Sequence, residues 1–162
     1  MLTYKCLRCG KEETESNIRL VRREGLILCK CCFEEYEKEK ASRPKKGRVC
    51  VIDDDWFMKG FFKEILEDYD VSYEPRIPLD EGSLAGFDVL IVDGEGIGNS
   101  KFKNGVEFLK AYKKQGQNKG LIHFSGLIRP SDEKTLEALG VECLEKGRDP
   151  DLLVQDVEEV VK

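Results

Sequence analysis

Four apolar runs in the last two thirds of this chain each end next to a residue suited to phosphoryl chemistry. Two acids, Asp53 and Asp54, follow the run Val49–Ile52, and a third, Asp93, follows Val89–Val92. A hydroxyl, Ser125, follows Leu121–Phe124, and an amine, Lys146, comes shortly after Val141–Leu144. Carboxylate oxygens are the ligands that Mg²⁺ prefers, and a lysine ammonium binds phosphate as a mobile point charge. The set therefore indicates a magnesium and phosphoryl site.

The elements that must position these residues can be predicted from the same stretch. Strand and helix patterns alternate from Arg48 to the end of the chain. We expect strands at 49–52, 71–73, 87–92, 121–124 and 141–144, and helices at 56–69, 105–114, 131–139 and 150–161. We also expect Ser131 to cap one helix and Pro150 to open the last.

This alternation predicts an α/β fold with a doubly wound five-stranded parallel sheet. Runs without polar alternation, such as Val89–Val92, suit strands that are covered on both faces. In an open parallel sheet the ligand crevice lies at the carboxyl ends of the strands, so residues that end four strands converge there.

A second kind of chemistry is confined to the beginning of the chain. Cys6 and Cys9 are separated by two residues, and so are Cys29 and Cys32. Two such pairs can present four thiolates tetrahedrally to one Zn²⁺. A stretch of about 40 residues has too small a core to fold without such a staple. Cys31 could replace Cys32, but the spacing of the first pair favours Cys29 with Cys32.

The residues around the cysteines predict a small zinc-binding domain. Between the two pairs, strands at 18–22 and 26–28 flank Arg23, Glu24 and Gly25, which indicates a hairpin. Good helix formers follow at 33–40, with acids early and lysines late. This order resembles a treble-clef zinc finger. We expect a four-cysteine zinc finger at 1–42, a linker at 43–47 and the α/β domain at 48–162.

Charge is distributed unevenly between these parts. The whole chain has a net charge of −5. Residues 1–47 carry 12 Lys and Arg against 8 acids, whereas 48–162 carry 15 against 24. The weakly basic head is no nucleic-acid footprint by itself, so we expect it to bind a protein partner rather than DNA. Because no apolar stretch is long enough for a membrane span or a signal peptide, we expect a cytoplasmic protein.

The part from residue 48 onward resembles the receiver domain of two-component response regulators. Asp53 and Asp54 match the paired acids of that family, Asp93 its phosphoacceptor, Ser125 its Ser/Thr and Lys146 its lysine. The resemblance implies that Asp93 accepts a phosphoryl group with Mg²⁺ held by the three aspartates, and that Ser125 and Lys146 bind phosphoryl oxygens. It also implies a histidine kinase or phosphotransfer protein as the donor.

The chain departs from that family in ways that affect regulation more than fold. The second helix, around 78–85, is expected to be stunted. The aromatic switch residue is replaced by Cys143, and Gly147 stands where proline is usual. The single histidine, His123, is expected to be a packed residue, because the phosphoryl mechanism needs no base.

These observations predict a response-regulator-like signalling protein, a phosphoacceptor rather than a true enzyme, with a zinc module as its protein-binding output. Two alternatives stay open. A haloacid-dehalogenase-like phosphatase would use Asp53 and Asp55 as its aspartate pair. A pseudo-receiver scaffold would keep the fold without phosphotransfer.

Overall fold

The structure is a computed structural model that describes residues 2–21, 24–117 and 119–161. The chain divides into two compact units, Met1–Pro44 and Lys45–Lys162. Each unit has a sheet and a hydrophobic core of its own. The finer division into 1–42, 43–47 and 48–162 stays a prediction.

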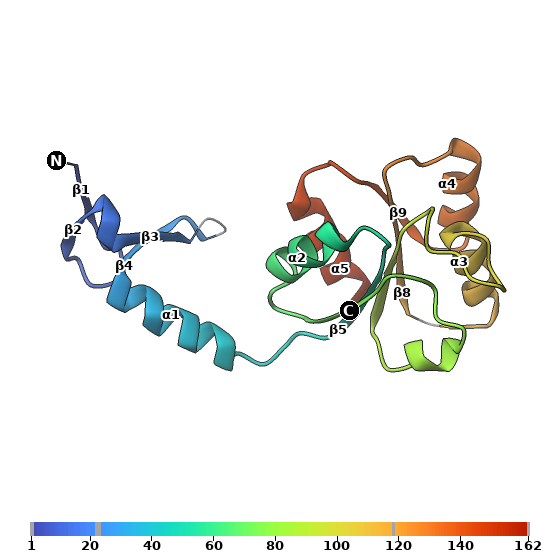
Figure 1. The fold of residues 1–162 in the computed structure, drawn as a ribbon, viewed down its shortest axis with the longest axis horizontal. Coiled ribbons are helices and arrows are strands. Elements are labelled where there is room, and N and C mark those ends of the chain that lie inside the picture. Colours follow the sequence, from blue (N-terminus) through green and yellow to red (C-terminus); the bar gives the residue numbers. More distant parts are fainter. Residues whose placement is uncertain (1, 22–23, 118, 162) are drawn as a thin grey trace. The chain divides into compact units, whose positions relative to one another are not determined.

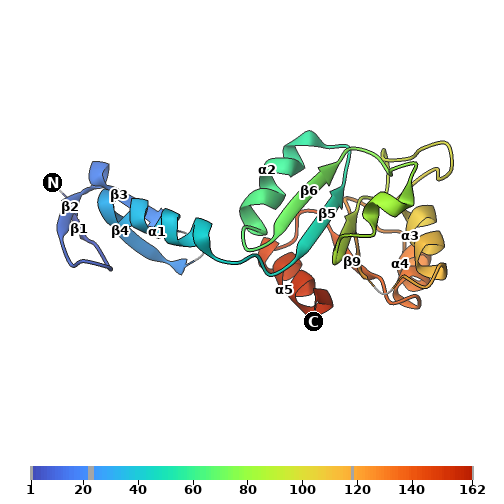
Figure 2. The same cartoon turned by 90° about the horizontal axis from the view of Figure 1, so that it is seen from below.

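The first unit consists of two hairpins and a helix (Figure 2). β1 (Thr3–Lys5) pairs with β2 (Glu12–Thr14), a short 3-10 turn η1 (Glu15–Asn17) follows, and β3 (Ile18–Val21) pairs with β4 (Leu26–Cys29). Arg22 and Arg23 of the predicted hairpin lie outside the described residues. Helix α1 (Lys30–Ser42) begins earlier than the predicted residue 33, because Cys29 already takes the extended N-cap conformation.

The core of the first unit is small. Among its described residues, the buried side chains are three cysteines, one leucine and one tyrosine: Cys6, Cys29, Cys32, Leu28 and Tyr36. So little buried apolar surface contributes little to the free energy of folding. A further source of stability is therefore needed for a unit of this size.

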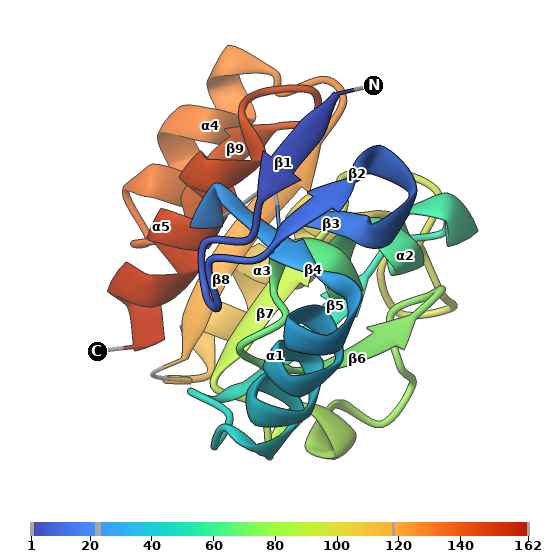
Figure 3. The ribbon, with the colours of Figure 1, turned by 90° about the vertical axis from the view of Figure 1, so that its left-hand side faces the viewer.

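The second unit is built on a five-stranded parallel sheet, which confirms the predicted fold class. Its strands are β5 (Arg48–Ile52), β6 (Asp70–Glu74), β7 (Val89–Val92), β8 (Gly120–Ser125) and β9 (Glu142–Glu145). They lie in the order β6-β5-β7-β8-β9 (Figure 3). The register aligns Ile52 with Val92 and Val92 with His123, so the candidate site residues lie together at the carboxyl ends of the strands.

Helices cover both faces of this sheet (Figure 1). α2 (Trp56–Ile65) and α5 (Pro150–Val161) pack on one face through residues such as Phe62 and Val157. α3 (Gly105–Lys114) and α4 (Pro130–Glu137) pack on the other through residues such as Phe108 and Leu136. Because both faces are covered, all four residues of β7 are buried.

The helix between β6 and β7 is stunted, as predicted. Only a 3-10 turn, η3 (Glu81–Leu84), is present there. The apolar cover that a full helix would give is supplied partly by the long loop after β7, whose Ile97 and Phe102 are buried in the same core as Leu84. Ile77 donates a backbone hydrogen bond to the Ile97 carbonyl at 2.9 Å, which ties this loop to the segment before η3.

Other predicted helix boundaries also differ from the structure. α2 ends at Ile65 rather than residue 69, because Leu66 leaves the helical conformation at φ −103°, ψ 34°. Ser131 does not cap α4, because Pro130 occupies the first helical turn and the N-cap falls on Arg129. Pro150 does open α5, as expected. Within the described residues, no helix combines the length and apolarity that crossing a membrane requires.

Candidate functional site

Three carboxylates converge at the carboxyl edge of the sheet. Asp53 and Asp54 follow β5, and Asp93 follows β7. The backbone N–H of Asp93 donates to the Ile52 carbonyl at 2.9 Å, which fixes the two strand ends side by side. Each of the three aspartates offers a carboxylate oxygen, and these oxygens all lie within 4.8 Å of one another. Asp53 and Asp93 are buried, whereas Asp54 is exposed.

Lys146, which follows β9, contacts two of these carboxylates. Its backbone N–H donates to the Ser125 carbonyl at 2.8 Å, and its Nζ lies 2.8 Å from Asp53 Oδ2 and 3.1 Å from Asp93 Oδ2. Burial disfavours the ammonium charge, but the hydrogen bond to Asp53 and the charge of Asp93 outweigh it and raise the pKa of Lys146. The lysine is therefore a fixed cation between two carboxylates.

The remaining oxygens of these two carboxylates are held by the backbone. Asp53 Oδ1 accepts the N–H of Asp55 at 2.9 Å, and Asp93 Oδ1 accepts the N–H of Gly94 at 2.7 Å. Burial raises the pKa of Asp53, while Lys146 and the Asp55 N–H act in the opposite direction. Both side chains are thus oriented before any ligand arrives, which lowers the cost of reorganisation on binding.

Ser125 and His123 lie on the same face of β8, beside the backbone that follows Asp93. A Cβ atom on Gly94 would lie 2.7 Å from Ser125 Oγ and 3.0 Å from His123 Cε1, so a side chain there would displace one of these two residues. His123 is buried, and its Nδ1 lies 3.3 Å from the Val92 carbonyl. A packed histidine was the expectation, and this contact agrees with it.

Asp55 lies outside the acidic cluster. Its carboxylate accepts the backbone N–H of Phe57 at 3.0 Å and so caps α2. Its carbonyl accepts the hydroxyl of Tyr73 at 2.5 Å. Burial, and then the charge of Asp53, raise the pKa of Tyr73. Asp55 therefore has a structural task, and no observation favours the pairing of Asp53 with Asp55.

Sequence reasoning missed two residues at this site. Tyr73 comes from β6, the strand next to β5, and only the sheet order brings it near the acids. Gly96 has a φ of +78°, and a Cβ atom there would overlap the Asp54 carboxylate. The loop backbone therefore rests directly on this carboxylate. The richness of the loop in glycine was the available signal.

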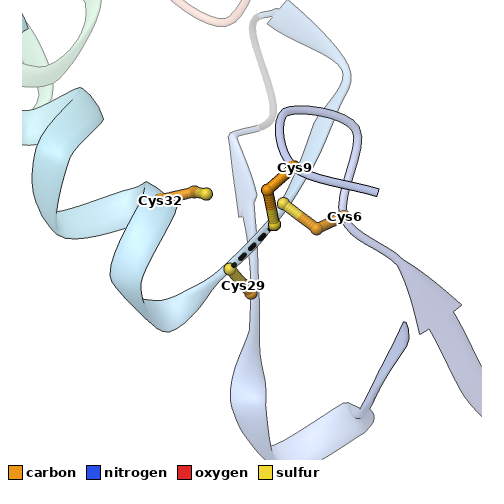
Figure 4. Close-up of side chains that lie close together, drawn as sticks. All are labelled: Cys6, Cys9, Cys29 and Cys32. Carbon is orange, nitrogen blue, oxygen red and sulfur yellow. Dashed lines mark hydrogen bonds between the residues drawn. The ribbon is translucent and has the colours of Figure 1, made fainter. Parts of the chain in front are cut away.

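The four predicted cysteines form a second cluster, in the first unit (Figure 4). Cys6 and Cys9 come from the turn after β1, Cys29 ends β4, and Cys32 lies in the first turn of α1. Their four sulfur atoms lie within 4.8 Å of one another. Cys31 is exposed and is not part of the cluster.

This geometry is compatible with zinc. The sulfurs of Cys9 and Cys29 are 3.7 Å apart. Two ligands of a tetrahedral Zn²⁺, each at about 2.3 Å, would be separated by about 3.8 Å. Hydrogen bonds from the backbone of Cys29 and of Cys9 lower the pKa of the Cys6 thiol to about 6. These hydrogen bonds favour the thiolate form of Cys6, which is the form that binds a metal.

Comparison with known proteins identifies the fold of the second unit. No family model matches the sequence, and no curated protein is significantly similar to it. Solved structures match well. A CheY-like response regulator receiver domain protein from Methanospirillum hungatei is 21% identical with a TM-score of 0.57, and the match covers 74% of this chain and 94% of that one.

Two further matches agree. Full-length FixJ from B. japonicum is 24% identical with a TM-score of 0.61, over 72% of this chain and 58% of that one. The CheX-CheY-BeF3-Mg complex from Borrelia burgdorferi matches with 18% identity and a TM-score of 0.59, over 71% of this chain and 89% of that one. At these identities the likeness establishes the fold: this chain contains a domain with the receiver fold.

Proposed function

We propose that this chain is a response-regulator-like signalling protein that accepts a phosphoryl group on Asp93. One observation carries the proposal: the Asp93 carboxylate shares the Lys146 ammonium with Asp53, at 3.1 and 2.8 Å, inside a cluster of three acids. For a single aspartate after a strand, a helix cap or a solvated turn is the more common role. Asp93 caps no helix, and its partners suit phosphoryl chemistry instead.

In the proposed step an Asp93 carboxylate oxygen attacks phosphorus. The new bond joins this oxygen to phosphorus, and the bond between phosphorus and the donor's leaving group breaks. For a phosphohistidine donor, the leaving group is the imidazole, which takes the bonding electron pair. Lys146 and the Ser125 hydroxyl would bind oxygens of the transferred group. Lys146 contacts Asp93 directly, and Ser125 lies beside Gly94, the next residue in the chain.

The residues present fit a magnesium ion. Asp53, Asp54 and Asp93 offer hard oxygen ligands close together, and Asp54 is exposed, as a site that keeps water ligands requires. When bound, Mg²⁺ would neutralise charge on the phosphoryl oxygens. The donor is proposed to be a histidine kinase or phosphotransfer protein.

The first unit is proposed to hold one structural Zn²⁺ through Cys6, Cys9, Cys29 and Cys32. The closeness of the four sulfurs supports this, and so does the small core, which cannot stabilise the unit alone. We propose that the zinc module binds a downstream protein rather than nucleic acid, because its positive charge is weak.

The test is phosphorylation of the intact chain with acetyl phosphate and Mg²⁺, followed by mass spectrometry. We expect one phosphoryl group per chain, labile in base, and we expect Asp93→Asn to abolish it. Asp151→Asn, a conservative change at an exposed carboxylate, is the matched control and should be modified like the wild type. No modification of the wild-type protein by acetyl phosphate with Mg²⁺ would defeat the proposal. A phosphatase activity lost in Asp53→Asn but kept in Asp93→Asn would favour the dehalogenase-like alternative.

A further inference from the structure

A cavity of about 560 Å³ lies between α2, the end of β9 and the start of α5. Its inner wall is apolar and is formed by side chains from several elements, among them Phe61, Phe124, Leu144 and Leu153. Phe124 and Leu153 are buried, so they form the floor. Sites for small molecules typically measure about 300–1,000 Å³ and have walls of this kind with a few polar groups.

The polar groups of this cavity lie on its solvent side. Glu145, Arg148 and Asp149 line it and are exposed. Arg148 contacts Glu145 at 3.9 Å, a loose exposed pair. The Asp149 carboxylate accepts the N–H of Asp151 at 3.0 Å but has no cationic partner among the described residues.

Lys146 belongs to the cavity and to the acidic cluster at once. It lines the cavity, yet its ammonium is held by Asp53 and Asp93. Because Lys146 is paired with Asp53 and Asp93, the Glu145 and Asp149 carboxylates face only Arg148 among the other charged side chains that line the cavity. Residues 48–162 as a whole also carry 24 acids against 15 bases. The electrostatic potential at the mouth therefore favours a positive ligand.

The rim adds an exposed aromatic surface. Phe57, which lines the cavity, is 69% exposed and stacks on Trp56, with ring centroids 4.1 Å apart. The faces of aromatic rings attract cations as well as apolar groups. Large side chains left exposed beside a hollow mark a place where a ligand is covered on binding.

We propose that this cavity binds a small amphipathic amine, whose apolar body fills the space between α2, β9 and α5 and whose ammonium lies at the Glu145 and Asp149 carboxylates. This is a second site, separate from the phosphoacceptor, and it does not depend on the proposed function. Because Lys146 is a wall of both, occupancy of the cavity changes the surroundings of the Asp93 carboxylate.

Calorimetric titration of the full chain with three probes of equal body tests this: 4-phenylbutylamine, 4-phenylbutanol and 4-phenylbutyrate. The expected result is one site per chain, with affinity falling from the amine to the alcohol to the acid. Ligands of this size reach low-millimolar dissociation constants, so titration to about 10 mM suffices. Lack of saturable amine binding at that concentration, or tighter binding of the acid, overturns the proposal.

Variants then locate the site. Met58→Trp fills the cavity from α2 and should weaken amine binding by more than about tenfold, whereas Met58→Leu conserves volume and should not. Leu152→Trp at the half-exposed rim gives the same test with less risk to folding. Glu145→Gln should weaken the amine about two- to fivefold and leave the alcohol unchanged. Amine binding that persists unchanged in both tryptophan variants places the probe elsewhere and refutes the site.

Discussion

At the scale of single residues, the loop after β7 needs glycine at a defined position beside the acids. Gly96 has a positive φ, and any Cβ there would collide with the Asp54 carboxylate. The loop can therefore rest on the proposed metal ligand only because it lacks a side chain at this point. Both the backbone conformation and the close approach require glycine.

We predict that Gly96→Ala weakens Mg²⁺ binding by about tenfold or more, because the added methyl group displaces either the loop or Asp54. The emission of Trp56, the single tryptophan, gives the readout during a magnesium titration, since it follows the acids directly. Gly60→Ala is the matched control. A Cβ there meets nothing within 4 Å, and alanine should stabilise α2 by about 1 kcal/mol without changing Mg²⁺ affinity. Equal affinity in both variants would contradict the prediction.

His123 should make stability depend on pH. Burial lowers the pKa of His123 below its ordinary value of 6.5, although the contact with the Val92 carbonyl and the charges of Asp93, Asp132 and Glu95 act against this. The unfolded chain therefore takes up the proton first as pH falls. The free energy of unfolding must then decrease from about pH 6.5 downward to the pKa of the folded state, by at most about 1.4 kcal/mol per pH unit.

His123→Gln should remove this component, because glutamine keeps a donor for the Val92 carbonyl but does not titrate. Urea unfolding followed by Trp56 emission at about pH 7.5 and about pH 5.5 gives the measurement. The loss of stability on acidification should be smaller in the variant, while the titration of other groups cancels in the comparison. The same loss in both proteins would show that the imidazole is not shielded.

At the scale of elements, the stunted region between β6 and β7 shows how a missing helix is compensated. Lys119, at the foot of β8, donates three hydrogen bonds to backbone carbonyls, those of Leu84, Ala85 and Phe87, at 2.5–2.7 Å. Burial lowers the pKa of Lys119, which is the cost of holding the ammonium there. The Leu84 carbonyl also accepts the backbone N–H of Phe87 at 3.3 Å, so the lysine adds to the pairing at the end of a short turn.

Lys119→Met should therefore lower the free energy of unfolding by about 1–3 kcal/mol, because charge-assisted hydrogen bonds to partly buried carbonyls are lost. Lys114→Met, at an exposed position at the end of α3, should change it by less than about 0.5 kcal/mol. Denaturant unfolding measures both. If the two variants were equally stable, the carbonyls would be satisfied by water and the lysine would be incidental.

The elements of the second unit show which features the sequence predicts and which it does not. The strands could be predicted, and so could the closeness of the acids that follow them, because an apolar run that ends at Asp53 or Asp93 carries both in one local pattern. The contacts of Lys119 and Tyr73 could not. Each depends on which strands become neighbours, and Lys119 reaches a carbonyl 35 residues away in the chain. Ser131 failed for a local reason, since Pro130 competed for the same helix start.

At the scale of the whole molecule, the two units draw their stability from different sources. The second unit has two large apolar clusters, one on each face of its sheet. In the described part of the first unit, the buried cluster has five side chains, and three of these are cysteines. A unit with so small a core depends on a bound metal for its stability, whereas a sheet covered on both faces does not need one. The two should therefore respond separately to loss of a metal.

We predict that a strong chelator unfolds the first unit and leaves the second folded. Amide signals of residues in α1 should lose their dispersion on chelation, whereas Trp56 emission and the signals of β5 and β7 should not change. Limited proteolysis should then remove the first unit and leave a resistant fragment that begins near Lys45, where the compact unit starts. Cys31→Ser should bind zinc like the wild type, because Cys31 lies outside the sulfur cluster. Cys32→Ser should release it. Chelation that unfolded both units together would show that the sheet domain needs the metal-bound head, and the division into independently stable units would fail.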